Sequence, residues 1–356
     1  MRKGWEYKRW KEVLTIINGK NQSAVVDANG EYPIYGSGGI MGYANNWLCP
    51  ENCVIIGRKG NINKPIFVET KFWNVDTAFG LNANIEYLLP KFLFYFCLDY
   101  NFERHNKAVT IPSLTKADLL KIDIPLPPKS TQLAIVSELD KINELIRLKK
   151  EQLKDFDNLA QSLFYEMFGD PVENEKGWEV KKIKDIAKYY NGVAHEQDVD
   201  KDGDFVLINA KFISSEGQIK KYSNIQRFPL LKNDIVMVLS DLPNGKSLAK
   251  CFLIDEDNKY TLNQRICCFR GFEGSSVYLK NIINRNPYLL SFDNGKGQTN
   301  LRKGDVEKLP IPLPPLSLKH LFAQRIEQIE REKSEVQKSI QDLETLLASR
   351  MQYWFE

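Results

Sequence analysis

Two segments of the chain place apolar residues at alternating spacings of three and four, which is the seven-residue period of a helix with one apolar stripe. Each segment follows the pentapeptide IPLPP, found at 124–128 and again at 311–315. The residues between the stripe positions are charged or Gln-rich, as on an exposed helix surface. The pattern predicts two long helices with a shared coiled-coil interface formed by Leu139, Ile142, Ile146, Leu153, Phe156, Leu163, Ile326, Ile329, Val336, Ile340, Leu343 and Leu347.

Each of these helices would contain about 38 residues and measure about 57 Å, at a rise of about 1.5 Å per residue. The alternative is a pair of ordinary amphipathic core helices, but those are several times shorter. A compact domain cannot cover such a stripe along its whole length, so we expect the two helices to pack on each other in an antiparallel pair. The prolines should hold extended backbone before each helix, and Ser130 and Ser317 are the predicted N-caps.

The two helices belong to a larger internal repeat. The segment LTKADLLKIDIPLPP (114–128) aligns with LRKGDVEKLPIPLPP (301–315), and GWEYKRWKEVLTIING (4–19) aligns with GWEVKKIKDIAKYYNG (177–192). The offset grows from 173 to 187, so the second half carries about 14 more residues in its middle. The two halves of the chain are similar at their ends and different in their middle segments. This indicates one scaffold that presents two different recognition surfaces. We predict a globular domain at 1–128, a helix at 129–168, a second globular domain at 169–315 and a second helix at 316–356.

Short apolar runs in the globular parts alternate with Gly, Asn and Pro turns, which is typical of strands. The predicted strands include CVIIGR (53–58), KPIFVE (64–69), DFVLINA (204–210) and DIVMVLS (234–240), and PKFLFYFCLDY (90–100) is the predicted helix before the first proline joint. The expected fold class is therefore α+β: two similar globular domains separated by a pair of long antiparallel coiled-coil helices, with a pseudo-twofold internal repeat.

Composition favours an intracellular protein and gives a weak hint of nucleic acid. Hydrophobic residues make up 43% and charged residues 27% of the chain, close to globular averages. The beginning MRKGWEYKRW has no apolar segment for a signal peptide, and the longest apolar run, FLFYFCL, is too short to cross a bilayer. The six cysteines show no disulfide or metal framework, so we expect reduced, buried thiols and a cytoplasmic location, with no membrane partner. The net charge of +3 comes from the globular parts, which suits DNA without requiring it.

Residue patterns for catalysis or metal binding are missing. His105, His195 and His320 are the only histidines, and none has the spacing of a metal site or a catalytic triad. NGKS (244–247) lacks the glycine that a phosphate-binding loop requires. DVDKDGD (198–204) begins like a calcium loop but has Asn209 in place of the final Glu, which leaves an acidic surface turn as the preferred interpretation and calcium as the alternative. We expect this chain to catalyse no reaction and to hold no metal.

The order of globular domain, IPLPP, helix, globular domain, IPLPP, helix resembles the specificity subunit of type I restriction-modification systems. YPIYGSGGIMGY (32–43) and CVIIGRKGNINKPIFVETKFWNVDTAFGLN (53–82) are similar to a common pattern of its target-recognition domains, and LKNDIVMVLS (231–240) and YTLNQRICCFRG (260–271) resemble the corresponding strands. The resemblance covers essentially the whole chain. It implies a non-catalytic subunit whose two target-recognition domains each read one half of a bipartite site in double-stranded DNA, while the helices set the spacer between the halves.

The same resemblance implies the partners and cofactors. Two methyltransferase subunits would dock around the helices, two restriction and translocation subunits would join them, and S-adenosylmethionine, ATP and Mg²⁺ would be bound by those partners. Because Arg suits guanine, Asn suits adenine and Lys suits phosphate, the candidate DNA contacts are Ser37, Arg58, Lys59, Asn61, Lys64 and Asn74 in the first domain and Lys211, Asp241, Asn244, Lys246, Asn263 and Arg265 in the second. The alternative function is a two-domain protein-binding scaffold without DNA specificity, and for each single residue the alternative is a solvated surface position.

Overall fold

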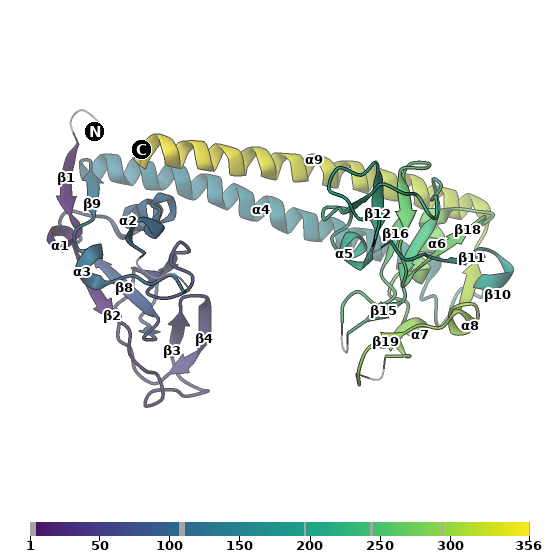
Figure 1. Ribbon diagram of the computed structural model, residues 1–356, viewed down its shortest axis with the longest axis horizontal. Helices are drawn as coiled ribbons and strands as arrows, with labels where there is room; N and C mark the ends of the chain where they lie inside the picture. The colour runs from purple at the N-terminus through teal and green to yellow at the C-terminus, as the bar shows by residue number, and fades with distance from the viewer. Residues whose placement is uncertain (1–4, 107–110, 196, 243–244, 294, 356) are drawn as a thin grey trace. The chain divides into compact units, whose positions relative to one another are not determined.

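The structure, a computed structural model, describes residues 5–106, 111–195, 197–242, 245–293 and 295–355 (Figure 1). The chain forms two compact units, one made of residues 1–151 and 337–356 and the other of residues 152–336. Each unit contains a mixed α/β domain together with parts of two long helices. The α+β fold with long helices is thus confirmed, while the predicted limits of the domains stay a prediction.

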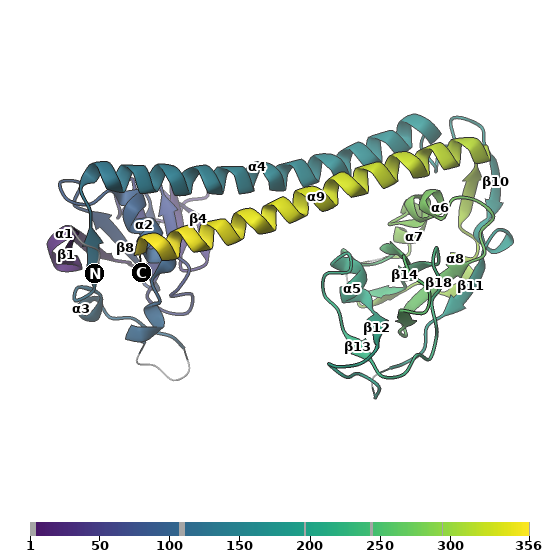
Figure 2. The same cartoon turned by 90° about the horizontal axis from the view of Figure 1, so that it is seen from above.

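The two long helices occupy the segments predicted for them. Helix α4 runs from Lys129 to Phe168 and helix α9 from Leu316 to Phe355, and each contains 40 residues (Figure 2). All twelve residues of the predicted stripe are buried or half-buried. Leu139 belongs to the apolar core of the first unit, and Leu163, Ile326 and Ile329 belong to that of the second. The assignment of all twelve residues to one coiled-coil interface stays a prediction.

Ion pairs between the helices show that they run antiparallel within each unit. In the first unit, Lys150 of α4 donates to Glu344 of α9 over 2.7 Å. In the second unit, Lys333 of α9 donates to Asp157 of α4 over 2.7 Å. In the first unit Glu138 also pairs with Arg350, and in the second Phe164 of α4 also packs on Phe322 of α9. In both units, then, a later residue of α4 lies beside an earlier residue of α9.

Both long helices begin one residue after a proline pair, and this corrects the predicted caps. The carbonyl oxygen of Pro128 accepts hydrogen bonds from the amides of Thr131 and Gln132, at 2.8 and 3.0 Å. Pro315 plays the same part at the start of α9. Ser130 and Ser317 lie inside the helices and are not N-caps. The reason is that each proline before the helix already occupies the N-cap position, where its carbonyl oxygen accepts the first hydrogen bonds of the helix.

The IPLPP segments themselves are edge strands. Strand β9 (Asp123–Leu126) pairs antiparallel with β1 (Glu6–Arg9), and β20 (Pro310–Leu313) pairs in the same way with β10 (Glu179–Lys182). Within the described part of the chain, each of these sheets consists of two strands. Proline cannot donate to a sheet and is tolerated at such edges. The two ends of each globular domain are joined in this way directly before the helix.

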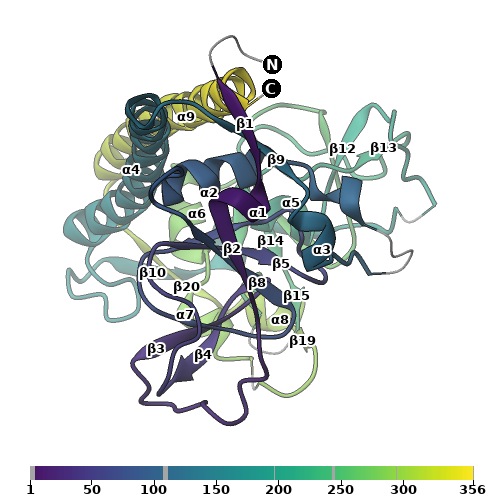
Figure 3. The same cartoon turned by 90° about the vertical axis from the view of Figure 1, so that its left-hand side faces the viewer.

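In the first globular domain, Figure 3 shows β2, β8 and β5 next to one another. One sheet has the order β2-β8-β5-β6 and another the order β4-β3-β7. The core lies between the first sheet and helix α2, around the fully buried Trp10 and Phe92. The elements are β2 (Leu14–Asn18), β3 (Tyr32–Gly36), β4 (Gly39–Ala44), β5 (Cys53–Gly57), β6 (Ile66–Val68), β7 (Trp73–Asn74), β8 (Ala78–Ala83), α1 (Trp10–Val13), α2 (Pro90–Asp99), η1 (Phe102–His105) and α3 (Lys116–Leu119).

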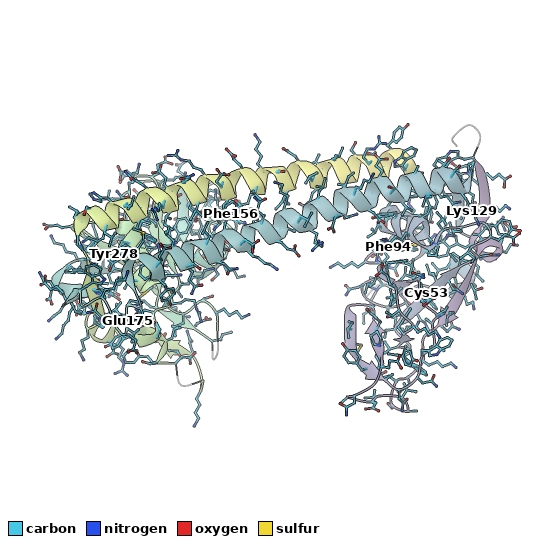
Figure 4. All side chains as sticks on the ribbon, turned by 180° about the vertical axis from the view of Figure 1, so that it is seen from behind. Cys53, Phe94, Lys129, Phe156, Glu175 and Tyr278 are labelled. Atoms are coloured by element: carbon cyan, nitrogen blue, oxygen red, sulfur yellow. The ribbon has the colours of Figure 1, made fainter. Side chains whose placement is uncertain are left out.

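The second globular domain repeats these sheets in the order β11-β18-β14-β16 and β13-β12-β17. Its core includes Tyr278, which packs on Phe168 of α4 and is labelled in Figure 4. The elements are β11 (Lys188–Asn191), β12 (Phe205–Ile208), β13 (Tyr222–Ser223), β14 (Ile235–Val238), β15 (Ser240–Asp241), β16 (Cys251–Leu253), β17 (Tyr260–Leu262), β18 (Ile266–Arg270), β19 (Thr299–Asn300), η2 (Ile183–Asp185), α5 (Ala210–Ser214), α6 (Ser276–Ile283), α7 (Pro287–Leu290) and α8 (Lys303–Val306).

Equivalent glycines confirm that the repeat extends to the backbone. A Cβ added at Gly19 would lie 1.8 Å from the carbonyl oxygen of Val75, and one at Gly192 would lie 1.9 Å from that of Asn263. These glycines end the two aligned GWE segments. Val75 and Asn263 both lie in the turn that precedes an inner strand of the larger sheet, β8 in the first domain and β18 in the second. Only glycine permits such a close approach of two backbones.

The additional residues of the second half lie mainly in two connections. Tyr32 pairs with Ala44 in the first domain, whereas Phe205 pairs with Ser223 in the second, so this connection is six residues longer and contains α5. Gly57 pairs with Ala78, whereas Val238 pairs with Ile266, which makes the second of these connections seven residues longer. The paired strands stay the same and the loops differ.

Candidate nucleic-acid interface

In the first domain, two connections bring predicted contact residues together. Ser37 lies in the turn between β3 and β4, and Asn61 lies in the loop between β5 and β6. A side chain added at Gly38 would meet the Asn61 Nδ2 atom at 3.6 Å, and one at Gly60 would meet the Ser37 Oγ atom at 4.0 Å. The turn and the loop therefore lie side by side, with an amide and a hydroxyl as hydrogen-bonding groups.

The loop after β5 also carries the predicted cations of this domain, all of them exposed. Arg58 is anchored through its backbone amide, which donates to Thr77, and its guanidinium donates to the carbonyl oxygen of Asp76 over 3.4 Å. Lys59 pairs with Ser113 through the backbone, which leaves its side chain exposed. Lys64 is exposed near the end of the same loop. This arrangement places three positive charges beside Asn61 and Ser37.

Asn74 does not belong to this surface, and its prediction as a DNA contact is wrong. Its side chain is fully buried, accepts a hydrogen bond from the Cys49 thiol over 3.1 Å and donates to the carbonyl oxygen of Ala78 over 3.2 Å. The backbone carbonyl of Asn74 accepts from the amide of Lys20. Asn74 therefore holds strands together, because a buried amide must have its hydrogen bonds satisfied inside the protein.

In the second domain, the predicted residues lie where several strands end. The amide of Asn263 donates to Ile208 at the end of β12, and the amide of Leu239 after β14 donates to the carbonyl oxygen of Arg265. Arg265 has a positive φ of 65° and an exposed side chain. Lys211 is exposed on α5, directly after β12. One edge of the domain therefore carries Lys211, Asn263 and Arg265 together.

The loop between β15 and β16 continues the same edge. Its Ser247 hydroxyl lies 2.7 Å from that of Ser214 at the end of α5, and Lys246 is exposed beside it. Asn244, also predicted as a contact, lies outside the described residues. The loop is thus fastened to α5 and presents Lys246 outward.

Asp241 shapes this loop from within, which corrects its prediction as a base contact. Its Oδ2 atom accepts from the amides of Ser247 and Leu248, at 2.6 and 3.1 Å, and its Oδ1 atom accepts from Leu242. A side chain at Gly245 would collide with the same carboxylate, at 2.1 Å. Both carboxylate oxygens are therefore used by the backbone of the loop, and we remove Asp241 from the proposed contacts.

The sequence reasoning missed one part of this edge. Strand β19 pairs with β15, with Asn300 opposite Ser240, and the exposed Gln298 donates from its Nε2 atom to the Ser240 hydroxyl. Asn300 is exposed as well. The amide-rich stretch NGKGQTN could have indicated these residues, since Asn and Gln suit adenine. Their position could not be inferred, because the stretch lies far along the chain from the other loops.

The calcium-like segment forms a surface turn. Asp200 accepts from the amide of Asp202 and from the side chain of Asn224, and Asp198 pairs with Arg227. The guanidinium of Arg227 lowers the pKa of Asp198 below its usual value. Within the described part of the chain, no group of three or more His, Cys, Asp or Glu residues could hold a metal ion. The carboxylates of this turn accept from Arg227, Asn224 and the backbone of Asp202.

The six cysteines are all free and buried, as expected. Burial raises the pKa of the Cys53 thiol to about 12, which keeps it protonated and unreactive at neutral pH. Among the described residues, no helix is long and apolar enough to cross a membrane.

Comparison with known proteins agrees with this architecture. The profile of the family described as "Type I restriction modification DNA specificity domain" matches residues 2–155 and 175–345. The chain is 24% identical to the MjaVIII specificity subunit of Methanocaldococcus jannaschii, a type I restriction enzyme subunit, over 96% of this chain and 92% of that protein. It is 20% identical to the EcoDI specificity subunit of Escherichia coli, over 91% of this chain and 81% of that protein.

Solved structures show the same fold. A type I restriction-modification S subunit from M. genitalium has a TM-score of 0.58 at 14% identity and covers 99% of this chain and 96% of its own. A chain from a study of type I complex assembly has a TM-score of 0.61 at 15% identity, with coverage of 99% and 97%. With the two duplicated domains, their IPLPP joints and the family profile matching both halves, this chain belongs to the type I restriction modification DNA specificity domain family.

Proposed function

We propose that this chain gives a type I restriction-modification complex its DNA sequence specificity, with each globular domain reading one half of a bipartite site. The observation that carries this proposal is the repeat of two sheet frameworks with the same strand order and different loops. In both domains the differing loops carry exposed Lys, Arg and Asn residues at one edge of the framework. Such loops are suited to phosphate and base-edge contacts.

The proposed contacts in the first domain are Ser37, Arg58, Lys59, Asn61 and Lys64. In the second domain they are Lys211, Lys246, Asn263 and Arg265, to which the structure adds Gln298 and Asn300. The scaffold alternative explains the duplication as well. It gives no reason for the cations and amides that line both loop sets.

Partners complete the proposed complex. We infer that the chain is non-catalytic, that two methyltransferase subunits dock around α4 and α9, and that two restriction subunits join them in the cytoplasm. S-adenosylmethionine, ATP and Mg²⁺ would be bound by these partners. The modest net charge of +3 supports this division of roles, since a chain with so few excess cations relies on partners to hold the DNA backbone.

The test is a domain exchange in the complete complex. Residues 171–310 are replaced by the matching segment of a related specificity subunit, and the methylated sites in cellular DNA are mapped by sequencing. One half of the site should change while the other half and the methylation activity persist. A simultaneous change of both halves would refute the modular assignment.

A further inference from the structure

Away from the candidate DNA interface, the second unit contains a cavity of about 820 Å³. It is bounded by the segment from β10 to β11, by the loop after β18 and by the first turn of α9. Strand β18 separates it from the interface: Arg265 precedes this strand and Gly271, which lines the cavity, follows it. Its size is within the range of small-molecule sites, about 300–1,000 Å³.

Lys319 lines this cavity and has no ion-pair or hydrogen-bond partner among the described residues. Only 6% of the surface of Lys319 is exposed to solvent. Among the described residues, no carboxylate lies within 4 Å of its ammonium group and no acceptor takes a hydrogen bond from it. Its Nζ atom lies 5.5 and 6.0 Å from the ring centres of Phe272 and Tyr278, and a side chain at Gly274 would approach it to 3.3 Å.

This position is energetically unfavourable for a lysine. Burial lowers the pKa of Lys319, so the charged form is disfavoured. The residue is also the fourth of α9, at the positive end of the helix dipole. The two aromatic rings offset only part of this cost. A group that persists in such a place is a candidate for ligand binding.

The internal repeat supplies a natural comparison. The residue equivalent to Lys319 in the first half is Gln132, which is also buried. Its Oε1 atom accepts from the amide of Leu89, and its Nε2 atom donates to the carbonyl oxygens of Tyr87 and Pro127. Gln132 is therefore a satisfied structural residue. At the same place Lys319 leaves its ammonium directed to the cavity.

We propose that this cavity binds a small anionic molecule with one phosphate or carboxylate group, which the Lys319 ammonium contacts directly. Lys184 and Lys188 on the rim add positive charge. Carboxylates line the cavity as well, and one of them, Glu307, lies 3.6 Å from Lys303. These carboxylates disfavour a polyanion, so the ligand is a molecule with a single anionic group on an otherwise neutral body.

The experiment is calorimetric titration of the full chain at constant ionic strength with inorganic phosphate, with AMP and with acetate. Phosphate and AMP represent the phosphate source, and acetate represents the carboxylate. The variant Lys319→Gln installs the residue of the first half and should fold, which circular dichroism verifies. The matched control is Lys338→Met, which removes an exposed charge from the same helix, outside the cavity.

The expected result is binding of at least one probe, weakened tenfold or more by Lys319→Gln and unchanged by Lys338→Met. Equal affinity in wild type and Lys319→Gln would overturn the proposal. Absence of binding by the wild-type chain to all three probes would overturn it too. The inference does not depend on the DNA-reading function, since the titration uses no DNA.

Discussion

Glu138 joins the two long helices in the first unit through two different side chains. Its carboxylate accepts from the Arg350 guanidinium and, over 2.9 Å, from the indole of Trp354. Arg350 lowers the pKa of Glu138 below its usual value. Arg350 interrupts the apolar pattern of the stripe, and a count of apolar positions treats it as a defect. In the structure its pairing with Glu138 fixes which parts of the helices lie opposite each other.

Replacing Glu138 by Gln should lower the free energy of unfolding by about 1 kcal/mol at neutral pH, since a partly exposed, hydrogen-bonded ion pair contributes about that much. The carboxyl has a lowered pKa in the folded chain, so its contribution is present above the unfolded pKa of about 4.3 and is lost as the pH falls through the folded value. Urea unfolding of both proteins between pH 3 and pH 7 measures this, if folding remains reversible. A stability difference that grows on acidification would contradict the assignment.

Asn74 and Asn61 form a matched pair of amides with opposite roles. Asn74→Ala should cost about 2 kcal/mol of stability, because it leaves the buried thiol of Cys49 without its acceptor and removes one of the two donors to the carbonyl oxygen of Ala78, the other being the amide of Gly19. Asn61→Ala should change stability by less than about 0.5 kcal/mol, since the residue is exposed. Denaturant unfolding separates the two.

The effects of the two substitutions on DNA specificity, measured by methylation mapping, should be the opposite of their effects on stability. Asn61→Ala should alter the first half-site, and Asn74→Ala should leave the sequence of the site unchanged in cells that still fold the protein. The sequence could not distinguish these two asparagines, because an amide in a strand and an amide in a loop look alike until burial is known. The same applies to Asp241, whose carboxylate is used by its own loop.

At the scale of elements, the long helices were predictable from their apolar period, and the main strands from short apolar runs between Gly, Asn and Pro turns. The short elements were not. Helix α5 has only five residues, and β15 and β19 have two each, so their patterns are too brief to identify. Their pairing depends on contacts between distant segments. These elements nevertheless contain two of the contacts proposed for the second domain, Lys211 and Asn300.

A heptad inserted into each long helix tests their role as a spacer. The insertions follow Glu151 in α4 and Val336 in α9, so the Lys150–Glu344 and Lys333–Asp157 pairs keep their register on either side. Seven residues add about 10 Å, and the unread spacer of the DNA site should lengthen by about three base pairs at about 3.4 Å each. Methylation mapping of the complex reports the spacer directly.

The control is the insertion in α4 alone. With only one helix lengthened, the Lys150–Glu344 and Lys333–Asp157 pairs cannot both form, which should reduce assembly or stability. Half-sites that change while the spacer keeps its length would show that the helices do not set the distance.

At the scale of the whole molecule, the duplicated arrangement predicted family and fold together, whereas no short motif did so alone. The excess positive charge of the chain is confined to the globular domains, with +3 for residues 1–128 and +2 for residues 169–315, while each helical segment carries −1. DNA affinity of the isolated chain should therefore be low. It should also fall with rising salt, as expected when a few phosphates are neutralised.

The purified chain alone should neither methylate nor cleave DNA. A radiolabelled methyl-transfer assay and a plasmid cleavage assay check this, with the same chain plus its methyltransferase subunits as the positive control. Methyl transfer by the isolated chain, after preparations are shown to lack methyltransferase, would disprove the non-catalytic assignment.

The close backbone approaches at Gly19 and Gly192 also bear on how this chain can evolve. A Cβ at either place would come within 2 Å of a carbonyl oxygen, and a backbone inside a sheet framework cannot withdraw that far. We expect both glycines to be retained in every lineage of the chain, even where the loops diverge to read other DNA. Positions that occupy equivalent places in the paired strands of the two halves should then tolerate the same kinds of substitution, although few of the aligned residues are the same.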